Sequence, residues 1–497
     1  MENNDSFRPV YSVAQIRKIE ESAMQNAAPS LMERAGLAAA KLARELAANG
    51  KPILILAGPG NNGGDALVAA RHLKAWWFRV TVVFTGDAAK LPADAAAALR
   101  AWMDAGGTLH DAIPAREEWG LVIDGLFGIG LARNLSARYL ELVEHLNRLG
   151  RPILALDTPS GLDADTGQVF GAAVRASHTL TFIALKPGLL TGNGTDYCGE
   201  VHVAAINLDP ISLLAPQGRL LDRSVGVALP PRPRNSHKGL SGSVGILGGA
   251  KSMCGAALLA GRAALKCGAG LVHVALLADQ APAFDPVQPE LMLCEPQRLI
   301  EKQNLNCLVV GPGLGQSAAA TLLLRRALES ASTLVLDADA LNLIAASQEL
   351  QALLQTRPDT SILTPHPAEA GRLLGITTHA VQQNRIAAAT LLSKSHNSLV
   401  VLKGAGSICA TPDGRWFVNP TGNPGMSSAG MGDVLSGMIG AFAAQRMKPL
   451  DALLLAVYLH GAAADALVEQ GEGPIGLSAS EVIAMARTLL NHWVYPN

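Results

Sequence analysis

The chain has 497 residues, of which 49% are hydrophobic and 16% are charged. This balance fits a folded enzyme of two or more domains and excludes a disordered or fibrous protein. The 40 basic and 41 acidic side chains give a formal net charge of −1, so composition gives no reason to expect nucleic acid or an anionic membrane as a partner. The sequence therefore predicts a soluble protein that binds small molecules.

Targeting and redox signals are weak. The six cysteines contain no CxxC pair, so they predict neither a disulfide framework nor a zinc site, and a cytoplasmic location is expected. The polar N-terminal residues lack the basic and apolar regions of a signal peptide. The apolar runs are interrupted by Gly, Pro or charge and fall short of the roughly 20 residues that cross a bilayer.

From Lys51 onward, short apolar runs alternate with Ala- and Leu-rich stretches, a pattern typical of a parallel sheet covered by helices. Ser12–Asn49 precedes this pattern and is expected to be helical, because Ala, Leu, Met and Glu dominate it. The strands expected in the first half are Pro52–Ala57, Arg79–Phe84, Gly120–Ile123, Pro152–Leu156 and His178–Ile183.

A proline-rich and basic segment at 229–239 interrupts the alternation, since its prolines cannot continue a central strand or a helix interior. We place the domain boundary just before it, giving domains of residues 1–222 and 223–497. Its basic side chains Arg232, Arg234, His237 and Lys238 suit either a solvated linker or the edge of a phosphate site. The elements expected in the second half are strands Ser243–Leu247, Leu271–Leu276, Cys307–Val310, Thr333–Leu336, Ser361–Leu363 and Ser398–Leu402, and helices Gly432–Gln445 and Asp451–Gln470.

A segment rich in glycine and asparagine, GPGNNGGD at 58–65, follows the first expected strand and opens a helix. Its backbone amides and the helix dipole can hold a pyrophosphate where side chains would obstruct it. The glycines also fit the G-x-G-x-x-G pattern, which alone suits a dehydrogenase equally well, and a turn chosen only for backbone freedom is a further alternative. Asn61 and Asn62 add amide groups that suit cation coordination or polar recognition.

Two further strand ends carry acidic groups, DGLFGIGL at 124–131 and DTPSGLD at 157–163. In an open parallel sheet the ligand lies beyond the carboxyl ends of the strands, so the three segments are expected to converge on one crevice. Any single aspartate there could instead cap the next helix. In this order and spacing the segments resemble the NAD(P)H-hydrate epimerase family over roughly the first 215 residues, with Ala66 where that family usually has Gly.

The resemblance implies a Rossmann-like domain that interconverts the R and S epimers of hydrated NADH and NADPH, called NADHX and NADPHX. It implies a potassium ion held by Asn62, Asp124 and Ser160. It also implies Asp157 as the acid/base, because loss and return of the C6 hydroxyl needs a group that moves a proton and stabilises a cation. The implied contacts to the hydrated cofactor are Asn61, Asn62, Gly63, Gly64, Asp65, Gly128, Ile129, Gly130, Leu131, Ala132, Arg133, Asn134 and Asp157.

Five segments stand out in the second half: GPGLG at 311–315, LDADALN at 336–342, TPHPAE at 364–369, VLKGAGS at 401–407 and NPGMSSAGMGD at 423–433. In the last one, small residues precede a helix, so their amides point at an anion, and Asp433 stands in the first turn as a possible base. Alone, each segment has a plainer reading: a tight turn at Gly311, a loop histidine at His366, a surface charge at Lys403.

Together these segments resemble the ADP-dependent NAD(P)H-hydrate dehydratase family, which implies a ribokinase-like α/β fold. The implied reaction removes water from the S epimer with ADP as co-substrate and Mg²⁺ on the nucleotide, and releases AMP and phosphate. Asp433 would take the hydroxyl proton, and the amides of residues 430–432 would form an anion hole. The implied nucleotide contacts are Lys403, Gly404, Ala405, Gly406, Ser407 and Gly432, and the implied contacts to the hydrated cofactor are Ala256, Gly313, His366 and Asp433. Small departures from that family stand at Ser407, Ala368, Pro424 and Ser428.

Two other functions stay open at this stage. The helix start and Asp433 would equally serve a kinase for a small vitamin-precursor alcohol, and the N-terminal domain could be a nucleotide-binding sensor without catalysis. The expected partners are NADHX, NADPHX and ADP, with no nucleic acid and no membrane. The resemblance also implies a homo-oligomer, a tetramer or larger.

Overall fold

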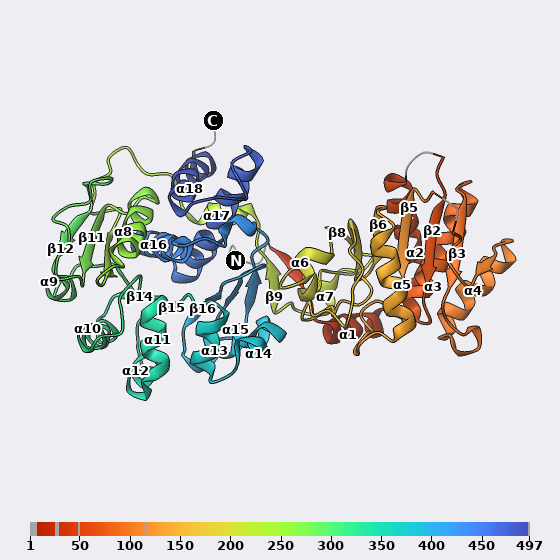
Figure 1. Ribbon diagram of the computed structural model, residues 1–497, viewed down its shortest axis with the longest axis horizontal. Helices are drawn as coiled ribbons and strands as arrows, with labels where there is room; N and C mark the ends of the chain where they lie inside the picture. Colours follow the sequence, from red (N-terminus) through yellow and green to blue (C-terminus); the bar gives the residue numbers. More distant parts are fainter. Residues whose placement is uncertain (1–6, 25–28, 48–49, 116–117, 496–497) are drawn as a thin grey trace. The chain divides into compact units, whose positions relative to one another are not determined.

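The computed structural model describes residues 7–24, 29–47, 50–115 and 118–495, and Figure 1 shows their helices and strands. The chain forms two compact units. One comprises Pro9–Gly218, and the other runs from Arg219 toward the C-terminus and also includes Phe7 and Arg8. Each unit has its own largely parallel sheet, so the expected α/β class is confirmed.

The sheet of the Pro9–Gly218 unit has the strand order β4-β3-β2-β5-β6-β7-β8, and neighbouring strands are parallel throughout. The chain reverses its direction of travel across the sheet beside β2, which is the Rossmann-like arrangement. The strands are β2 (Ile53–Ala57), β3 (Val80–Phe84), β4 (Leu109–His110), β5 (Leu121–Gly125), β6 (Ile153–Leu156), β7 (His178–Phe182) and β8 (Glu200–Ala204).

Helices cover both faces of this sheet because both faces of its central strands are apolar. Ile53 and Ile55 pack into one core cluster with α2, α3 and α4, whereas Leu54 packs into another with Val143 of α5. Successive side chains of a strand point to opposite faces, so a strand buried on both sides reads as a continuous apolar run. The helices are α1 (Val13–Met24), α2 (Leu31–Leu46), α3 (Asn61–Ala75), α4 (Ala93–Asp104), α5 (Ala137–Arg148), α6 (Gly194–Tyr197) and α7 (Pro210–Leu213), with short 3₁₀ turns at Ala88–Lys90 and Pro187–Leu189.

The second sheet has the order β1-β9-β18-β17-β16-β15-β14-β13-β10-β11-β12. Its strands from β16 to β12 in this order are parallel, and β17 and β18 form antiparallel pairs. The strands are β1 (Arg8–Val10), β9 (Gly218–Leu220), β10 (Ser243–Gly248), β11 (Leu271–Leu276), β12 (Met292–Cys294), β13 (Cys307–Val310), β14 (Thr333–Leu336), β15 (Ser361–Leu363), β16 (Leu399–Leu402), β17 (Ile408–Ala410) and β18 (Trp416–Val418).

One face of this sheet packs on α8, α16, α17 and α18 in a single apolar cluster. Figure 1 shows α10, α11, α13 and α15 on the other side of the same strands. The helices are α8 (Cys254–Lys266), α9 (Pro296–Ile300), α10 (Ala318–Leu328), α11 (Ala338–Ala346), α12 (Gln348–Gln355), α13 (Pro367–Leu374), α14 (Thr378–Gln383), α15 (Arg385–Ser395), α16 (Met431–Ala444), α17 (Pro449–Glu469) and α18 (Ala479–Val494), with 3₁₀ turns at Arg223–Ala228 and Pro424–Met426.

Helix α17 corrects one expectation, because it is long and apolar enough to cross a membrane. The sequence had suggested that glycine, proline and charged residues interrupt every long apolar run, but Pro449 stands at the start of α17, and Gly461 and Asp465 do not break the helix. Most of its apolar window, 67%, is buried inside the unit. A helix that is hydrophobic all round belongs to the core of a large domain as readily as to a bilayer, and here it lies in the core.

The expected strands are all present, with ends that differ by no more than two residues. The expected late helices match α16 and α17 equally closely, and the expected helical range Ser12–Asn49 contains α1 and α2. Residues 25–28 and 48–49 of that range lie outside the described residues. The proline-rich segment lies against the second unit, where the Arg232 guanidinium donates to the Gly268 carbonyl.

The tightest helix contact in the second unit predicts a large effect of one methyl group. A Cβ added at Gly437 of α16 would lie 2.1 Å from the carbonyl oxygen of Ala260 in α8. We expect Gly437→Ala to destabilise this unit by about 1–3 kcal/mol through overpacking, measured by urea unfolding. The matched control is Gly255→Ala in α8, where a Cβ would meet nothing within 4 Å, and it should leave stability unchanged or slightly raised. Equal effects of the two changes would contradict this account of the packing.

Candidate active sites

The first loop of the Pro9–Gly218 unit runs from the end of β2 into α3 and has room only for glycine at two positions. A Cβ at Gly58 would lie 1.8 Å from the Leu126 carbonyl oxygen, and one at Gly63 would lie 2.1 Å from the Gly58 carbonyl oxygen. The loop is therefore pressed against the end of β5. This close approach brings the first expected segment to the second at the carboxyl edge of the sheet.

Asp124 and Ser160 form a buried pair at that edge. The Ser160 hydroxyl donates to Asp124 Oδ1 at 2.6 Å, the Ser160 amide donates to Asp124 Oδ2 at 2.8 Å, and the Leu126 amide donates to Oδ1 at 3.2 Å. Burial raises the pKa of Asp124 to about 6, although these hydrogen bonds oppose the rise. A nearby cation would favour the ionised form of this carboxyl group.

Asp157 follows β6 and is held by a lysine that the motifs did not indicate. The Lys186 ammonium donates to Asp157 Oδ1 at 2.5 Å, and it also donates to the Thr181 hydroxyl and the Phe182 carbonyl at 2.8 Å. Lys186 is fully buried, whereas Asp157 keeps 8% exposure. Asp157 also adopts a left-handed backbone with φ +62°, a conformation that costs a non-glycine residue energy and that gathers at functional sites.

Two more carboxyl groups share this environment. Burial raises the pKa of Asp65 well above its usual range and also raises the pKa of Glu20 in α1, and in both cases the Asp157 carboxylate adds to the rise. Lys186 opposes the rise at Glu20. The site therefore places Asp157, paired with Lys186, beside two carboxyl groups whose pKa values are raised.

The side-chain amide of Asn62 lies beside Asp157. Both of its polar atoms are buried without a hydrogen-bond partner among the described residues. A Cβ added at Gly128 would lie 3.2 Å from Asn62 Cγ and 3.4 Å from Asp157 Oδ2, so Gly128 leaves space between the two side chains. Gly63 and Gly64 are buried beneath them, whereas Asn61 and most of the loop from Ile129 to Asn134 lie at the surface, outside this buried cluster.

The second unit gathers its polar groups at the ends of β14, β15 and β16. The Lys403 ammonium donates to Asp337 Oδ1 at 2.9 Å, and the Ser436 hydroxyl of α16 donates to Asp337 Oδ2 at 2.5 Å. Burial alone would raise the pKa of Asp337, but Lys403 and these hydrogen bonds outweigh it and lower the pKa. The same attraction to Asp337 and Glu369 raises the pKa of Lys403 against the effect of burial.

Asp433 lies in the first turn of α16, next to this ion pair. Burial and the Asp337 carboxylate raise the pKa of Asp433 to about 6, and Lys403 opposes the rise. A Cβ at Gly432 would lie 3.2 Å from the Lys403 ammonium nitrogen, and Gly430 caps the helix in a left-handed conformation with φ +89°. The helix therefore begins with small residues, whose backbone amides have no partner within the helix, next to a carboxyl group with a raised pKa.

His366 takes a capping position at the start of α13. Its Nδ1 accepts the amides of Ala368 and Glu369 at 3.1 and 3.3 Å, and its Nε2 lies 3.2 Å from Glu369 Oε1. Burial, and then Lys403, lowers the pKa of His366, so the neutral imidazole that these hydrogen bonds require is favoured. The plainer reading of this histidine as a local hydrogen-bonding residue is therefore satisfied, and its half-exposed ring still faces solvent.

The remaining expected contacts of the second unit lie at the same edge. A Cβ at Gly313 would lie 3.3 Å from the Ala256 side chain, and one at Gly311 would lie 1.8 Å from the Asp337 carbonyl oxygen, so both positions need glycine. Lys403 to Ser407 form the hairpin loop between β16 and β17, and the Ser407 hydroxyl donates to the Gly404 carbonyl at 2.9 Å.

Sequence reasoning missed four of the groups that shape these two clusters: Glu20, Lys186, Glu369 and Ser436. Glu20, Lys186 and Ser436 lie outside the motifs and reach these clusters from other elements, and Glu369 ends the 364–369 segment but was given no role. Lys186 is 29 residues from Asp157, and Ser436 is 99 residues from Asp337. The usable signal for Lys186 was a lysine directly after an apolar strand, a place where an unpaired charge would be costly.

Comparisons with known proteins match each unit to a family. Residues 244–485 match the family described as NAD(P)H-hydrate dehydratase, and residues 28–188 match the family described as YjeF-related protein N-terminus. A bifunctional NAD(P)H-hydrate repair enzyme of Escherichia coli is 39% identical over 470 residues, 93% of this chain and 89% of that enzyme. This chain belongs to the family of bifunctional NAD(P)H-hydrate repair enzymes. Another member, from Coxiella burnetii, is 39% identical over 97% of this chain and 99% of its own length.

Solved structures of single-domain proteins resemble about half of this chain. A ribokinase-like superfamily protein from Enterococcus faecalis is 27% identical, with a TM-score of 0.50, and covers 56% of this chain and 98% of its own. This likeness confirms the expected ribokinase-like fold. An ADP/ATP-dependent NAD(P)H-hydrate dehydratase from Bacillus subtilis, co-crystallised with ATP and Mg²⁺, is 29% identical over 55% of this chain and 98% of its own, with a TM-score of 0.49.

The ion pair of the first site predicts a stability effect that depends on both partners. We expect Lys186→Met to destabilise the Pro9–Gly218 unit by about 3–5 kcal/mol, because the variant leaves a buried carboxylate without its cation. The double variant Lys186→Met/Asp157→Asn should recover most of this loss in urea unfolding experiments. If the single variant were as stable as the wild type, or the double variant no better than the single one, the pairing would not hold this site together.

Proposed function

We propose that the protein repairs hydrated nicotinamide cofactors at two sites. The first unit epimerises R- and S-NADHX and NADPHX, and the second dehydrates the S epimers to NADH and NADPH with ADP. The observation that carries this proposal is that each unit gathers three features at the carboxyl edge of its sheet: a carboxyl group with a raised pKa, a lysine paired with a buried aspartate, and a glycine-lined helix start. Family membership over nearly the whole chain supports both activities.

In the first site, Asp157 is the acid/base. The C6 hydroxyl of the hydrated ring leaves with help from the ring nitrogen, and a proton on a carboxyl group lets it leave as water. Water then returns to either face of the ring, which interconverts the epimers. Lys186 keeps Asp157 in place, and the Asp157 carboxylate left after this proton transfer stabilises the positively charged ring and takes the proton back when water returns. Asp65, whose pKa burial raises well above its usual range, supplies a neighbouring carboxyl group. The proposed contacts to the hydrated cofactor are Asn61 to Asp65 and Gly128 to Asn134.

Asn62, Asp124 and Ser160 suit a potassium ion. Hard cations take oxygen ligands, and these residues offer an amide oxygen that lacks a partner, a buried carboxylate and a hydroxyl. Gly125, next to Asp124, also approaches the Asn62 backbone: a Cβ there would lie 3.0 Å from the Asn62 carbonyl oxygen. When bound, the ion would supply a fixed positive charge that keeps Asp124 ionised and orders the loop.

In the second site, Asp433 is the base for phosphoryl transfer from ADP. It takes the proton of the C6 hydroxyl as that oxygen attacks the β-phosphorus of ADP, and AMP leaves. The phosphorylated oxygen then leaves as phosphate while the ring loses a proton, which gives the reduced cofactor. The amides at the start of α16 would stabilise the transferring phosphoryl group, with Lys403 to Ser407 and Gly432 on ADP and Ala256, Gly313 and His366 on the hydrated ring.

Magnesium and the wider setting belong to the same proposal. Mg²⁺ binds through nucleotide phosphates more than through protein cages, so it would arrive with ADP. We also propose a cytoplasmic protein, which its six free cysteines support, that assembles as a homotetramer or larger. Light scattering of the purified protein measures the assembly.

The proposed function is tested by the recovery of NADH absorbance from a mixture of R- and S-NADHX, with K⁺ and Mg²⁺ supplied. We expect complete recovery that requires ADP. If only the S-NADHX were converted quickly, and the R-NADHX were then converted no faster than it epimerises spontaneously, the epimerase activity would be contradicted. Accumulation of a phosphorylated product without NADH would favour the vitamin-precursor kinase instead.

The raised pKa of Asp433 predicts the pH dependence of dehydration. Since the base must be ionised, kcat/KM for S-NADHX at saturating ADP should rise with pH through about 6 and then level off. Lys403 lowers the pKa of Asp433, so Lys403→Met should move this limb to higher pH as well as weaken ADP binding. A profile that is flat through pH 6 in the wild type, or a limb that Lys403→Met leaves in place, would argue against Asp433 as the base.

A further inference from the structure

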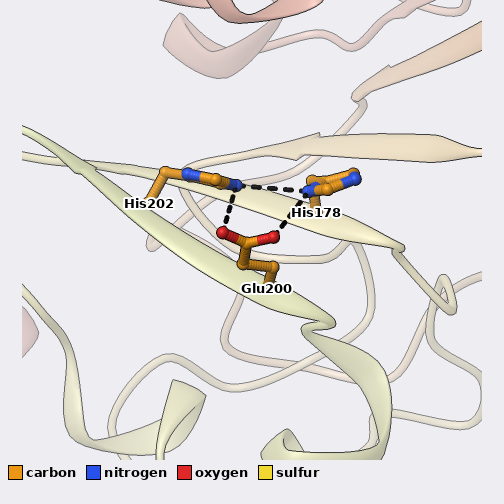
Figure 2. Close-up of side chains that lie close together, drawn as sticks. All are labelled: His178, Glu200 and His202. Carbon is orange, nitrogen blue, oxygen red and sulfur yellow. Dashed lines mark hydrogen bonds and ion pairs between the residues drawn. The ribbon is translucent and has the colours of Figure 1, made fainter. Parts of the chain in front are cut away.

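Three metal-binding side chains converge on the last two strands of the first sheet. In the parallel register of β7 and β8, His178 stands opposite Glu200, and His202 follows two residues along β8. Because side chains two residues apart share one face of a strand, all three project from the same face. Figure 2 shows the two imidazole rings facing each other with the Glu200 carboxylate spanning both.

The distances match those of a metal centre. His178 Nδ1 and His202 Nε2 are 3.2 Å apart, and the Glu200 oxygens lie 3.8 Å from the first nitrogen and 3.7 Å from the second. A tetrahedral Zn²⁺ holds its nitrogen and oxygen ligands at about 2.0–2.2 Å, which sets neighbouring ligand atoms about 3.3–3.5 Å apart. The two imidazole nitrogens, at 3.2 Å, lie just below this spacing, and the Glu200 carboxylate, whose side chain is 69% exposed, can move the few tenths of an ångström that separate it from this spacing.

We propose that His178, Glu200 and His202 form a binding site for a divalent transition-metal ion, with zinc as its preferred occupant. Two imidazole nitrogens and one carboxylate suit Zn²⁺, whereas Mg²⁺ and Ca²⁺ require oxygen ligands. The carboxylate neutralises half of the ion's charge. Because Glu200 lies at the surface, the fourth position is open to a water molecule.

This site is separate from the epimerase site. His178 and Glu200 stand at the first positions of β7 and β8. Asp157 instead accepts a hydrogen bond from the Phe182 amide at the other end of β7. The two ends of this five-residue strand are about 13 Å apart. Strand β8 ends the sheet order, so its other side has no strand partner in the described sheet. A bound ion would tie this edge strand to β7 and would stabilise the Pro9–Gly218 unit without touching the reacting groups.

The test uses the full-length protein after treatment with a chelator and dialysis. Zn²⁺ is titrated by calorimetry, and Co²⁺ is titrated by visible spectroscopy, in which tetrahedral coordination gives intense d–d bands. We expect a high-affinity equivalent of metal per chain in the wild type, with a rise in melting temperature. His202→Gln should abolish that equivalent and the tetrahedral Co²⁺ spectrum, and Glu200→Gln should weaken binding about 10- to 100-fold or more, which is what losing even an outer-sphere partner costs.

The matched control is His145→Gln, which removes an exposed histidine from α5 and should bind zinc like the wild type. Glu200→Gln is largely exposed and preserves the strand, so it tests the site even if His202→Gln impairs folding. Equal zinc affinity in the wild type and Glu200→Gln, or an octahedral Co²⁺ spectrum in the wild type, would overturn the proposal. Epimerase activity should be the same in all four proteins.

Discussion

Each unit of this protein pairs a lysine with a buried aspartate at the carboxyl edge of its sheet, and the electrostatics of each proposed site depend on that pair. Lys186 meets Asp157 at 2.5 Å, and Lys403 meets Asp337 at 2.9 Å. A buried charge without a partner would cost several kcal/mol of folding free energy. The pairing therefore allows ionised side chains to lie next to the apolar core. The same burial acts on Asp124 and Asp433, which lack a lysine of their own, and raises the pKa of each to about 6.

The two sites therefore use one physical arrangement for different purposes. In the first, the paired aspartate is the proposed proton-transfer group, and the pKa values of the neighbouring carboxyl groups Asp65 and Glu20 are raised. In the second, the paired aspartate raises the pKa of the proposed base beside it. Parallel strands make both arrangements possible, because the ends of neighbouring strands deliver side chains to one edge from positions far apart in the sequence.

Much of the fold could be predicted because the central strands are buried on both faces and read as uninterrupted apolar runs, as in Ile53–Ala57. Strand β8 could not be predicted, since Glu200 and His202 interrupt its apolar residues at the sheet edge. The glycine motifs follow strand ends in the structure, as the sequence predicted. They did not reveal Lys186 or Ser436, whose roles depend on tertiary packing, nor the His178–Glu200–His202 cluster, which exists only through the register of two strands.

We propose that the two sites act in sequence, with the first forming the S epimer that the second dehydrates, each through its own aspartate. The most direct measurement mixes Asp157→Asn with Asp433→Asn and follows NADH formation from pure R-NADHX with ADP. Each variant alone should be limited, the first to the spontaneous epimerisation rate and the second to no NADH at all. The mixture should restore NADH formation well above both, whereas a mixture no faster than its separate components would contradict the assignment of the two aspartates to separate steps.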